Sequence, residues 1–367
     1  MNLNEFIKKI LLPLWSNRVP FVCYHMPQSD DFVLLVNDTP KEVNLENFDF
    51  ENKGFVLFPY ESNKKKGIYF SDNNVLKYNS KTKELFGNPN KVIKKHRVEE
   101  DEILSINKEG FEKNVALAIN LIKNGLLQKV VVSKIKTNQI NNFSEYIKQL
   151  FESYPNTFTH LSYTTQYGLW LGASPEILLE RKNNKIKTIA LAGTQLGVGK
   201  ETRDAQWTQK EIAEQALVTR YIINRFKEIR LREFEDIGPK TVKAGHLFHL
   251  LTEFHIDEKE VNIPNLFTVL VKLLHPTSAV CGMPLAKAEA FIKETEIHNR
   301  NLFTGFLGPI NMGDESHLFV NLRTAKIVDK VIYTYAGAGI TIDSDPSKEW
   351  EETELKCNTM LNLLDDN

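Results

Sequence analysis

The stretch HLFVNLRTAKIVDKVIYTYAGAGI, residues 317–340, decides the fold class. Two runs rich in β-branched and aromatic residues, 317–327 and 330–340, flank Val328-Asp329. Two such runs around a short polar turn predict a β-hairpin. Because a hairpin joins antiparallel strands, this part of the chain favours an α+β fold over a repeated βαβ fold.

The preceding residues continue the same pattern. Helical spacing that ends at Gly125 predicts a helix over 109–125. Further helices are predicted at 143–154, 207–229, 284–295 and 346–364, and strands at 129–136, 160–165, 167–174, 176–182 and 185–193. Hairpins followed by helices, with few βαβ alternations, predict antiparallel sheets flanked by helices.

The first part of the chain, residues 1–104, is irregular and rich in short apolar runs. Strands are predicted within 19–27, 32–38 and 54–60, whereas 62–66 and 77–95 are predicted to be exposed loops. The first fifteen residues predict an amphipathic helix that is too short to span a membrane. The pattern changes near residue 105, which divides the chain into 1–104 and 105–367.

Charge and cysteine content exclude several classes of protein. The 367 residues carry 46 Lys and Arg against 47 Asp and Glu, a net charge of −1. The net charge therefore does not favour nucleic acid or an anionic membrane as a partner. Cys23, Cys281 and Cys357 lie far apart, which predicts reduced thiols in a cytoplasmic protein.

Three stretches resemble common binding motifs but lack the required residues or spacing. The stretch 193–202 lacks the glycine spacing and the Ser or Thr of a phosphate loop, and 337–342 lacks the third glycine of a dinucleotide fingerprint. Both are predicted to be tight turns. The stretch 246–255 contains three histidines, but their spacing matches no common zinc site, so core histidines are the simpler interpretation.

The acidic stretch DPSKEWEETELK, residues 345–356, is more informative. On a helix, Glu349, Glu352 and Lys356 fall within about 60° of arc and extend the apolar stripe of that helix. Glu351 and Glu354 point elsewhere and are predicted to be surface charges. A helix whose first turn simply leaves the core, with acids near its N-terminus, is the alternative interpretation.

A second helix repeats this spacing. Glu211 and Glu214 stand at i and i+3 in KEIAEQALVTRYII, and Glu214 stacks with apolar residues. Two converging pairs of carboxylates form a natural oxygen cage for Mg²⁺, whereas solvated acids in an early helical turn are the alternative. Helical spacing alone does not show that the two helices meet.

Two further charged residues lie beside strands. Glu176 follows a strand and a Ser-Pro bend, and Lys129 starts an apolar strand. A buried lysine can act as a base, although a solvated edge residue is the simpler interpretation of Lys129 without further context.

Nine blocks in order resemble the signature of the chorismate-utilising enzymes, which include anthranilate, aminodeoxychorismate, salicylate and isochorismate synthases. The blocks are KVVVSK, GASPE, LAGT, KEIAEQALV, HPTSAVCGMP, LFTGFLG, VNLRTAKI, YAGAGI and EWEETELK. The resemblance runs from about residue 105 to the C-terminus and implies the chorismate-binding fold as one large domain, with 105–367 as its chorismate-binding catalytic region. HPTSAVCG resembles the isochorismate synthase block, although Ser278 replaces a proline, Lys134 a common arginine and Gln215 a common histidine, and EIHNR replaces the usual EPFDR.

The resemblance implies a magnesium site. Glu214 and Glu352 would hold Mg²⁺ against the ring carboxylate of chorismate, and Glu211 and Glu349 would hold metal-bound waters.

The resemblance also implies an acid–base pair. Lys129 would activate water to attack C2, and Glu176 would protonate the departing C4 hydroxyl. Arg323 would bind the other carboxylate bidentately, assisted by Lys356. The residues implied at the substrate are Gly193, Thr194, His249, Phe303, Arg323, Gly337, Gly339 and Lys356.

The expected function is therefore a cytoplasmic, Mg²⁺-dependent isochorismate synthase, monomeric or homodimeric. No glutamine amidotransferase subunit is expected as a partner, and neither is nucleic acid or a membrane. A salicylate synthase and a catalytically silent chorismate-binding protein are the alternatives. The choice between a menaquinone and a siderophore pathway stays open.

Overall fold

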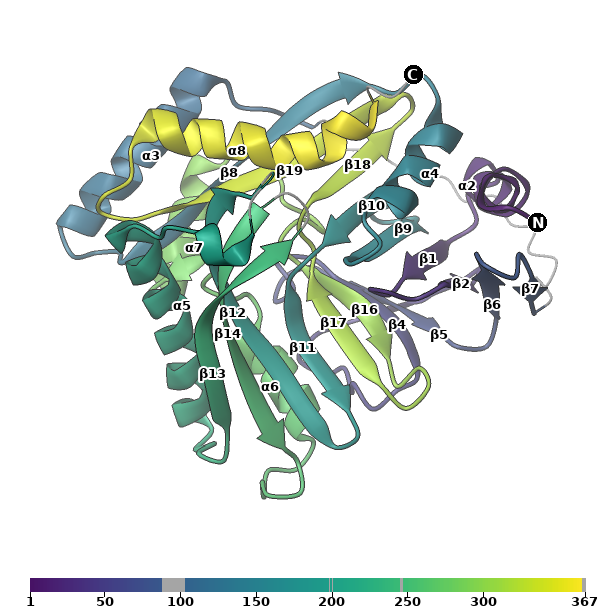
Figure 1. Cartoon of the computed structure of the whole chain (residues 1–367), viewed down its shortest axis with the longest axis horizontal. Coiled ribbons are helices and arrows are strands. Elements are labelled where there is room, and N and C mark those ends of the chain that lie inside the picture. Colours follow the sequence, from purple (N-terminus) through teal and green to yellow (C-terminus); the bar gives the residue numbers. More distant parts are fainter. Residues whose placement is uncertain (88–102, 198, 200, 245–246, 365–367) are drawn as a thin grey trace.

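Two antiparallel sheets form the centre of the molecule (Figure 1). The computed structural model describes residues 1–87, 103–197, 199, 201–244 and 247–364. One sheet has ten strands in the order β15-β8-β19-β18-β10-β9-β1-β2-β6-β7, and the other has nine in the order β13-β14-β12-β11-β17-β16-β4-β5-β3. Every strand pairing recorded among the described residues is antiparallel.

The strands of the two sheets alternate along the chain. The ten-stranded sheet contains β1 (Phe21–His25), β2 (Asp31–Val36), β6 (Val75–Asn79), β7 (Leu85–Phe86), β8 (Lys129–Gln139), β9 (Phe158–Thr164), β10 (Gly168–Ser174), β15 (Gly282–Met283), β18 (Thr324–Val328) and β19 (Val331–Ile340). The nine-stranded sheet contains β3 (Lys41–Val43), β4 (Gly54–Phe58), β5 (Gly67–Ser71), β11 (Ile177–Lys182), β12 (Lys185–Leu196), β13 (Glu235–Ala244), β14 (Leu247–Asp257), β16 (Phe306–Ile310) and β17 (Ser316–Val320).

Helices cover the outer faces of both sheets. They are α1 (Leu3–Phe6), the π-helical turn η1 (Ile7–Leu11), α2 (Leu12–Ser16), α3 (Lys108–Lys123), α4 (Phe143–Ser153), the 3₁₀ turn η2 (Thr202–Asp204), α5 (Gln209–Glu228), α6 (Leu266–Leu274), α7 (Leu285–Thr295), α8 (Pro346–Leu361) and the 3₁₀ turn η3 (Asn362–Leu364). Figure 1 shows α8 lying across β8 and β19, and α5 beside β12 and β14. Among the described residues, no helix is long and apolar enough to cross a membrane.

The burial of β1 explains why its sequence is an unbroken apolar run. Phe21 and Cys23 face the helices packed on the ten-stranded sheet. Val22 and Tyr24 face the second sheet, and the ring of Tyr24 lies 5.2 Å from that of Phe55. A strand covered on both faces needs apolar side chains at every position, which removes the usual alternation.

The predicted α+β fold with antiparallel sheets is confirmed. The helix predicted at 109–125 is α3, and the hairpin predicted around Val328-Asp329 is β18–β19. One detail is wrong, because the run 317–327 is not one strand: β17 ends at Val320 in one sheet and β18 begins at Thr324 in the other. The chain changes sheets between these residues.

Residues 1–104 contribute strands to both sheets. The loop predicted over 77–95 is wrong in part, since β6 and β7 occupy much of 75–86, and 88–95 lie outside the described residues. The tight turn predicted at 337–342 is also wrong at its start, because Gly337 and Gly339 lie inside β19. Cys23, Cys281 and Cys357 are free thiols, as predicted, and all three are buried.

Candidate active site

One cavity brings the predicted site residues together. It encloses about 1030 Å³, including its open mouth. It lies where β8 and β19 of one sheet meet the helices α5 and α8 and the strands β12 and β14 of the other sheet. All but two of the fourteen predicted site residues line it, the exceptions being Thr194 and Glu349. Only the backbone of Thr194 is described, within β12, so its role stays a prediction.

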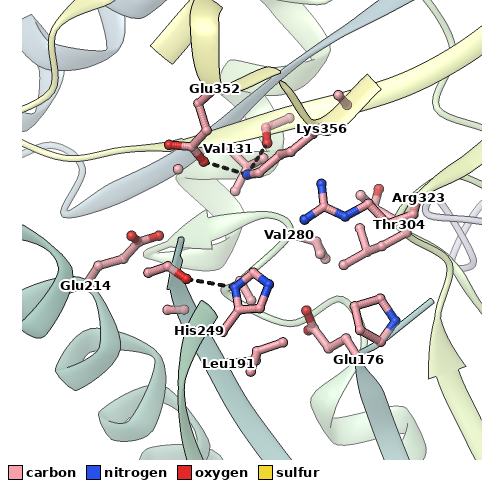
Figure 2. Close-up of a pocket in the computed structure, with 18 of the residues that line it drawn as sticks. Val131, Glu176, Leu191, Glu214, His249, Val280, Thr304, Arg323, Glu352 and Lys356 are labelled. Carbon is pink, nitrogen blue, oxygen red and sulfur yellow. Dashed lines mark hydrogen bonds and ion pairs between the residues drawn. The ribbon is translucent and has the colours of Figure 1, made fainter. Parts of the chain in front are cut away.

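The cavity has two chemically distinct ends. The acidic end carries Glu211, Glu214, Glu349 and Glu352, and the arginine end carries Arg323, Glu176 and His249. Figure 2 shows Glu214 and Glu352 on one side of the cavity and Arg323 and Glu176 on the other.

At the acidic end, α8 supplies an ion pair that faces the cavity. Lys356 Nζ lies 2.6 Å from Glu352 Oε1 and also donates to the carbonyl of Gly337 at 2.8 Å. Burial raises the pKa of Glu352, but Lys356, Lys210 and Arg323 outweigh it and lower the pKa below its usual value. Glu352 is therefore anionic at neutral pH.

Lys129 is buried, so the solvated edge residue considered from the sequence is excluded. Its side chain is 1% exposed, and its Nζ donates to Glu214 Oε1 at 2.8 Å. Gly339 makes room for this pair, because a Cβ there would lie 2.7 Å from Glu214 Oε1 and 2.9 Å from Lys129 Cε. A side chain at position 339 would displace the pair.

The two acidic helices meet, which their spacing did not show. Glu349 of α8 is 1% exposed, and its Oε1 accepts from Lys210 Nζ of α5 at 2.6 Å. Burial and the charge of Glu352 raise the pKa of Glu349. The alternative interpretation, in which the first turn of this helix leaves the core, is therefore wrong for Glu349.

Glu211 performs a structural task as well as lining the cavity. Its Oε2 accepts from the backbone N of Thr208 at 2.6 Å and from the Thr208 hydroxyl at 2.7 Å, which closes a capping box at the start of α5.

Glu354 corrects a sequence-based expectation. It was predicted to be a surface charge, but its carboxylate bonds the buried Lys134 and lies 2.6 Å from Lys136 Nζ. The ammonium of Lys134 also lies 3.3 Å from the ring centroid of Trp350. These contacts fix α8 against β8, whereas Glu351 is exposed as predicted.

At the arginine end, Glu176 stands where the chain passes from β10 to β11, and so from one sheet to the other. Burial raises the pKa of its carboxyl to about 7, against the opposing charges of Lys129, Arg323 and Lys356. No hydrogen bond or ion pair joins this carboxyl to another described side chain. It can therefore carry a proton near neutral pH.

Arg323 lies at the second sheet crossing, between β17 and β18. Its φ of 47° is in the left-handed region, which a non-glycine residue adopts only when its surroundings impose it. Its carbonyl accepts from Ala173 N at 3.0 Å, which ties this crossing to β10, close to Glu176. Burial lowers the pKa of the guanidinium from its usual value.

His249 faces a bulge in β12. The register between β12 and β14 shifts between Ala192 and Gln195, and the carbonyl of Gly193 in that bulge accepts from His249 Nδ1 at 2.8 Å. Burial, aided by Arg323, lowers the pKa of His249 to about 4. The imidazole is therefore neutral, and His255 lies apart while His246 lies outside the described residues.

The carboxylates at the acidic end suit a hard cation. Among the described residues no three His, Cys, Asp or Glu side chains are grouped closely enough to hold a metal alone. Mg²⁺ needs no such cage, since it is commonly held by one or two carboxylates with substrate and water. The Glu349 carboxylate also interacts with the Ser344 hydroxyl, but its buried Oε2 makes no hydrogen bond of full geometry among the described residues and could accept from a metal-bound water. These carboxylates are oxygen donors of the kind that Mg²⁺ takes, and Glu214 and Glu352 stay its predicted ligands.

Some residues of the cavity were missed from the sequence. They are Lys210, Tyr335, Thr304, Leu191 and Val280. Lys210 immediately precedes Glu211 in the KEIAEQALV block, and Tyr335 opens YAGAGI. A basic residue next to the acidic pair was a usable signal for Lys210, whereas Leu191 gave none, because an apolar residue on a strand has no signature of a site.

Comparisons with known proteins identify the family of the chain. The family model described as chorismate binding enzyme matches residues 62–365. Isochorismate synthase EntC of Escherichia coli (strain K12) is 31% identical over 263 residues, covering 69% of this chain and 66% of EntC. Anthranilate synthase component 1 of Acetivibrio thermocellus is 28% identical over 309 residues, covering 81% of this chain and 58% of that protein.

The fold is shared with a solved structure. MenF, the menaquinone-specific isochorismate synthase from Escherichia coli, matches with a TM-score of 0.75 at 20% identity, covering 94% of this chain and 88% of MenF. The chain belongs to the chorismate-binding enzyme family. It spans about two thirds of the length of EntC, and the two curated relatives carry names of two different activities.

Proposed function

We propose that this protein is an isochorismate synthase, a Mg²⁺-dependent isomerase that converts chorismate to isochorismate. The observation that carries the proposal is that Lys129 and Glu176, from different elements, line one cavity together with Arg323 and Lys356. This set offers a candidate base, a candidate acid and two cations for a dicarboxylate substrate. The name of EntC and the HPTSAVCG block support the choice within the family.

The proposed chemistry exchanges one hydroxyl for another. Lys129, as the free amine, takes a proton from a water whose oxygen forms a bond to C2 of the ring. The double bonds shift, the C4–O bond breaks, and Glu176 gives its proton to the departing hydroxyl. The raised pKa of Glu176, about 7, supports the role of acid because a protonated fraction is present near neutral pH.

The residues around the acid–base pair would orient the substrate. Arg323 offers two parallel N–H donors to one substrate carboxylate, and Lys356 adds a second positive charge. Gly337 and Gly339 leave space at the cavity wall beside the substrate. Glu214 and Glu352 would hold Mg²⁺, which when bound supplies positive charge to the other substrate carboxylate.

The HPTSAVCG block, which favours isochorismate synthase, contributes residues to the cavity wall. Ala279 and Val280, from HPTSAVCG, line its wall. The pathway served, menaquinone or siderophore, is left open by the proposal, since relatives named for both kinds of product are similar to this chain.

The test is direct turnover. Purified protein incubated with chorismate and Mg²⁺, with ammonia absent or present, should form isochorismate reversibly, identified by chromatography and mass. Anthranilate as the main product with ammonia would replace the proposed activity, salicylate with pyruvate would indicate a salicylate synthase, and no turnover would support a silent binding protein.

A further inference from the structure

Lys210 is a charged cavity residue to which the proposed chemistry gives no task. It stands in the first turn of α5, and its Nζ lies 2.6 Å from Oε1 of Glu349 in the first turn of α8. Its side chain is 31% exposed and reaches the cavity, whereas Glu349 is 1% exposed. The pair therefore joins the two helices on which the acidic end is built.

The charges around Lys210 are unbalanced. Glu214 is paired with Lys129 and Glu352 with Lys356, but both of those lysines have tasks at the substrate. The ammonium of Lys210 interacts electrostatically with Glu352 and Glu214 as well as with its bonded partner. Among the described lysines that bond these carboxylates, Lys210 is the one to which the proposed function gives no task at the substrate.

We propose that Lys210 is a built-in counter-cation that competes with the divalent metal ion for the carboxylates of the acidic end. Without metal, its ammonium neutralises Glu349 and holds α5 against α8. With metal, the dication becomes the main positive charge at Glu214 and Glu352, and the hold of Lys210 on the cluster weakens. The inference rests on the proposed magnesium site and adds a control on its occupancy.

Two consequences follow from the charges. Because like charges repel, the presence of Lys210 lowers the affinity of the site for any cation. A monovalent ion brings no more charge than the ammonium already there, so only a dication gains enough attraction to compete. The acidic end thereby stays assembled when metal is absent and selects divalent ions when they are present.

The test uses Lys210→Met, which keeps the aliphatic stem and removes the charge, with Lys227→Met as the matched control. Lys227 lies on the same helix, is exposed and is outside the cavity. Calorimetric titration with Mg²⁺ at pH 8 should give a dissociation constant at least about 10-fold lower for Lys210→Met than for wild type, since one repulsive unit charge nearby is removed. In EDTA the same variant should melt about 2–4 °C lower, because Glu349 is left buried and unpaired.

A second variant separates this account from a general loss of packing. In EDTA, Lys210→Met combined with Glu349→Gln should melt higher than Lys210→Met alone, because the unpaired charge is gone. Unchanged or weaker Mg²⁺ binding by Lys210→Met would overturn the inference, as would wild-type protein that binds no Mg²⁺, or an effect equal to that of Lys227→Met.

Failure of the inference and failure of the proposed function have different outcomes. If wild type makes isochorismate with Mg²⁺ but Lys210→Met binds the metal as wild type does, the inference fails and the function stands. If Lys210→Met tightens Mg²⁺ binding but wild type makes no isochorismate, the function fails and the competition between Lys210 and the metal stands.

Discussion

The acidic end and the arginine end of the cavity use the same residue type for opposite purposes. At the acidic end, Glu214, Glu349 and Glu352 each bond a lysine within 2.8 Å. At the arginine end, Glu176 is buried without such a bond, and its pKa rises to about 7. A lysine bonded to a carboxylate favours its charged form, which suits metal binding, whereas burial without such a bond favours the protonated form, which suits acid catalysis.

The largest loss of activity is expected from removing the acid–base pair. Lys129→Ala and Glu176→Gln should each lower kcat by at least about 100-fold, the scale of one positioned proton-transfer group. Steady-state kinetics with chorismate and saturating Mg²⁺ would measure this. Glu351→Gln, an exposed change on α8, is the control and should keep wild-type kcat. Near-normal kcat in either site variant would remove that residue from its proposed role.

The pH dependence of kcat/KM tests the protonation state of Glu176. Glu176 must carry a proton to act as an acid, and its pKa is about 7, so kcat/KM should fall as pH rises above about 7. A profile of kcat/KM between pH 5 and 9 would reveal this limb. A rate that stays level up to pH 9 would show that the acid is another group.

A smaller effect is expected where Glu354 meets Lys134. Glu354→Gln leaves the buried ammonium of Lys134 without its anionic partner, although Glu354 itself is about one third exposed and partly screened. The expected loss of unfolding free energy is about 1–2 kcal/mol. Urea denaturation would measure the free energy of unfolding of Glu354→Gln and of the exposed control Glu351→Gln. Equal values for the two variants would show that Glu354 is only a surface charge.

A stability change of similar size, but in the direction of a gain, is expected from Glu176→Gln. The pKa of Glu176 is about 7 in the folded protein against a usual 4.5, so its stabilising contribution is present below pH 4.5 and is lost as pH rises toward 7. The Gln variant lacks this loss and should exceed wild type by about 1–3 kcal/mol at pH 8, with little difference at pH 4.5. Urea denaturation at both pH values checks it, and a pH-independent difference would contradict the buried, proton-holding carboxyl.

The sequence predicted those features that depend on local order. The helix α3, the hairpin β18–β19 and the acidic face of α8 follow from periodicity, because side chains that share a face recur at fixed spacing. The blocks that resemble the family also predicted Arg323 and Lys356, which line the cavity.

Features that depend on distant contacts were not predictable in this way. The run 317–327 looks continuous, but Arg323 adopts a positive φ where the chain changes sheets, and periodicity does not report such a crossing. The ion pair of Lys210 with Glu349 joins residues 139 apart, and that of Lys134 with Glu354 joins residues 220 apart. A helical wheel places Glu354 off the apolar face of α8. It contains no information about Lys134 of β8, which bonds Glu354 in the folded protein.

The division of the cavity into a metal-binding end and a proton-donating end is tested most directly by titrating Mg²⁺ against turnover for Glu352→Gln and Glu176→Gln. Loss of one anionic ligand should weaken metal binding, so Glu352→Gln should lose most activity at low Mg²⁺ and recover part of it as Mg²⁺ rises. Glu176→Gln should stay inactive at every concentration, because metal does not replace a missing proton donor. Equal responses of the two variants to Mg²⁺, or no response in either, would contradict the account.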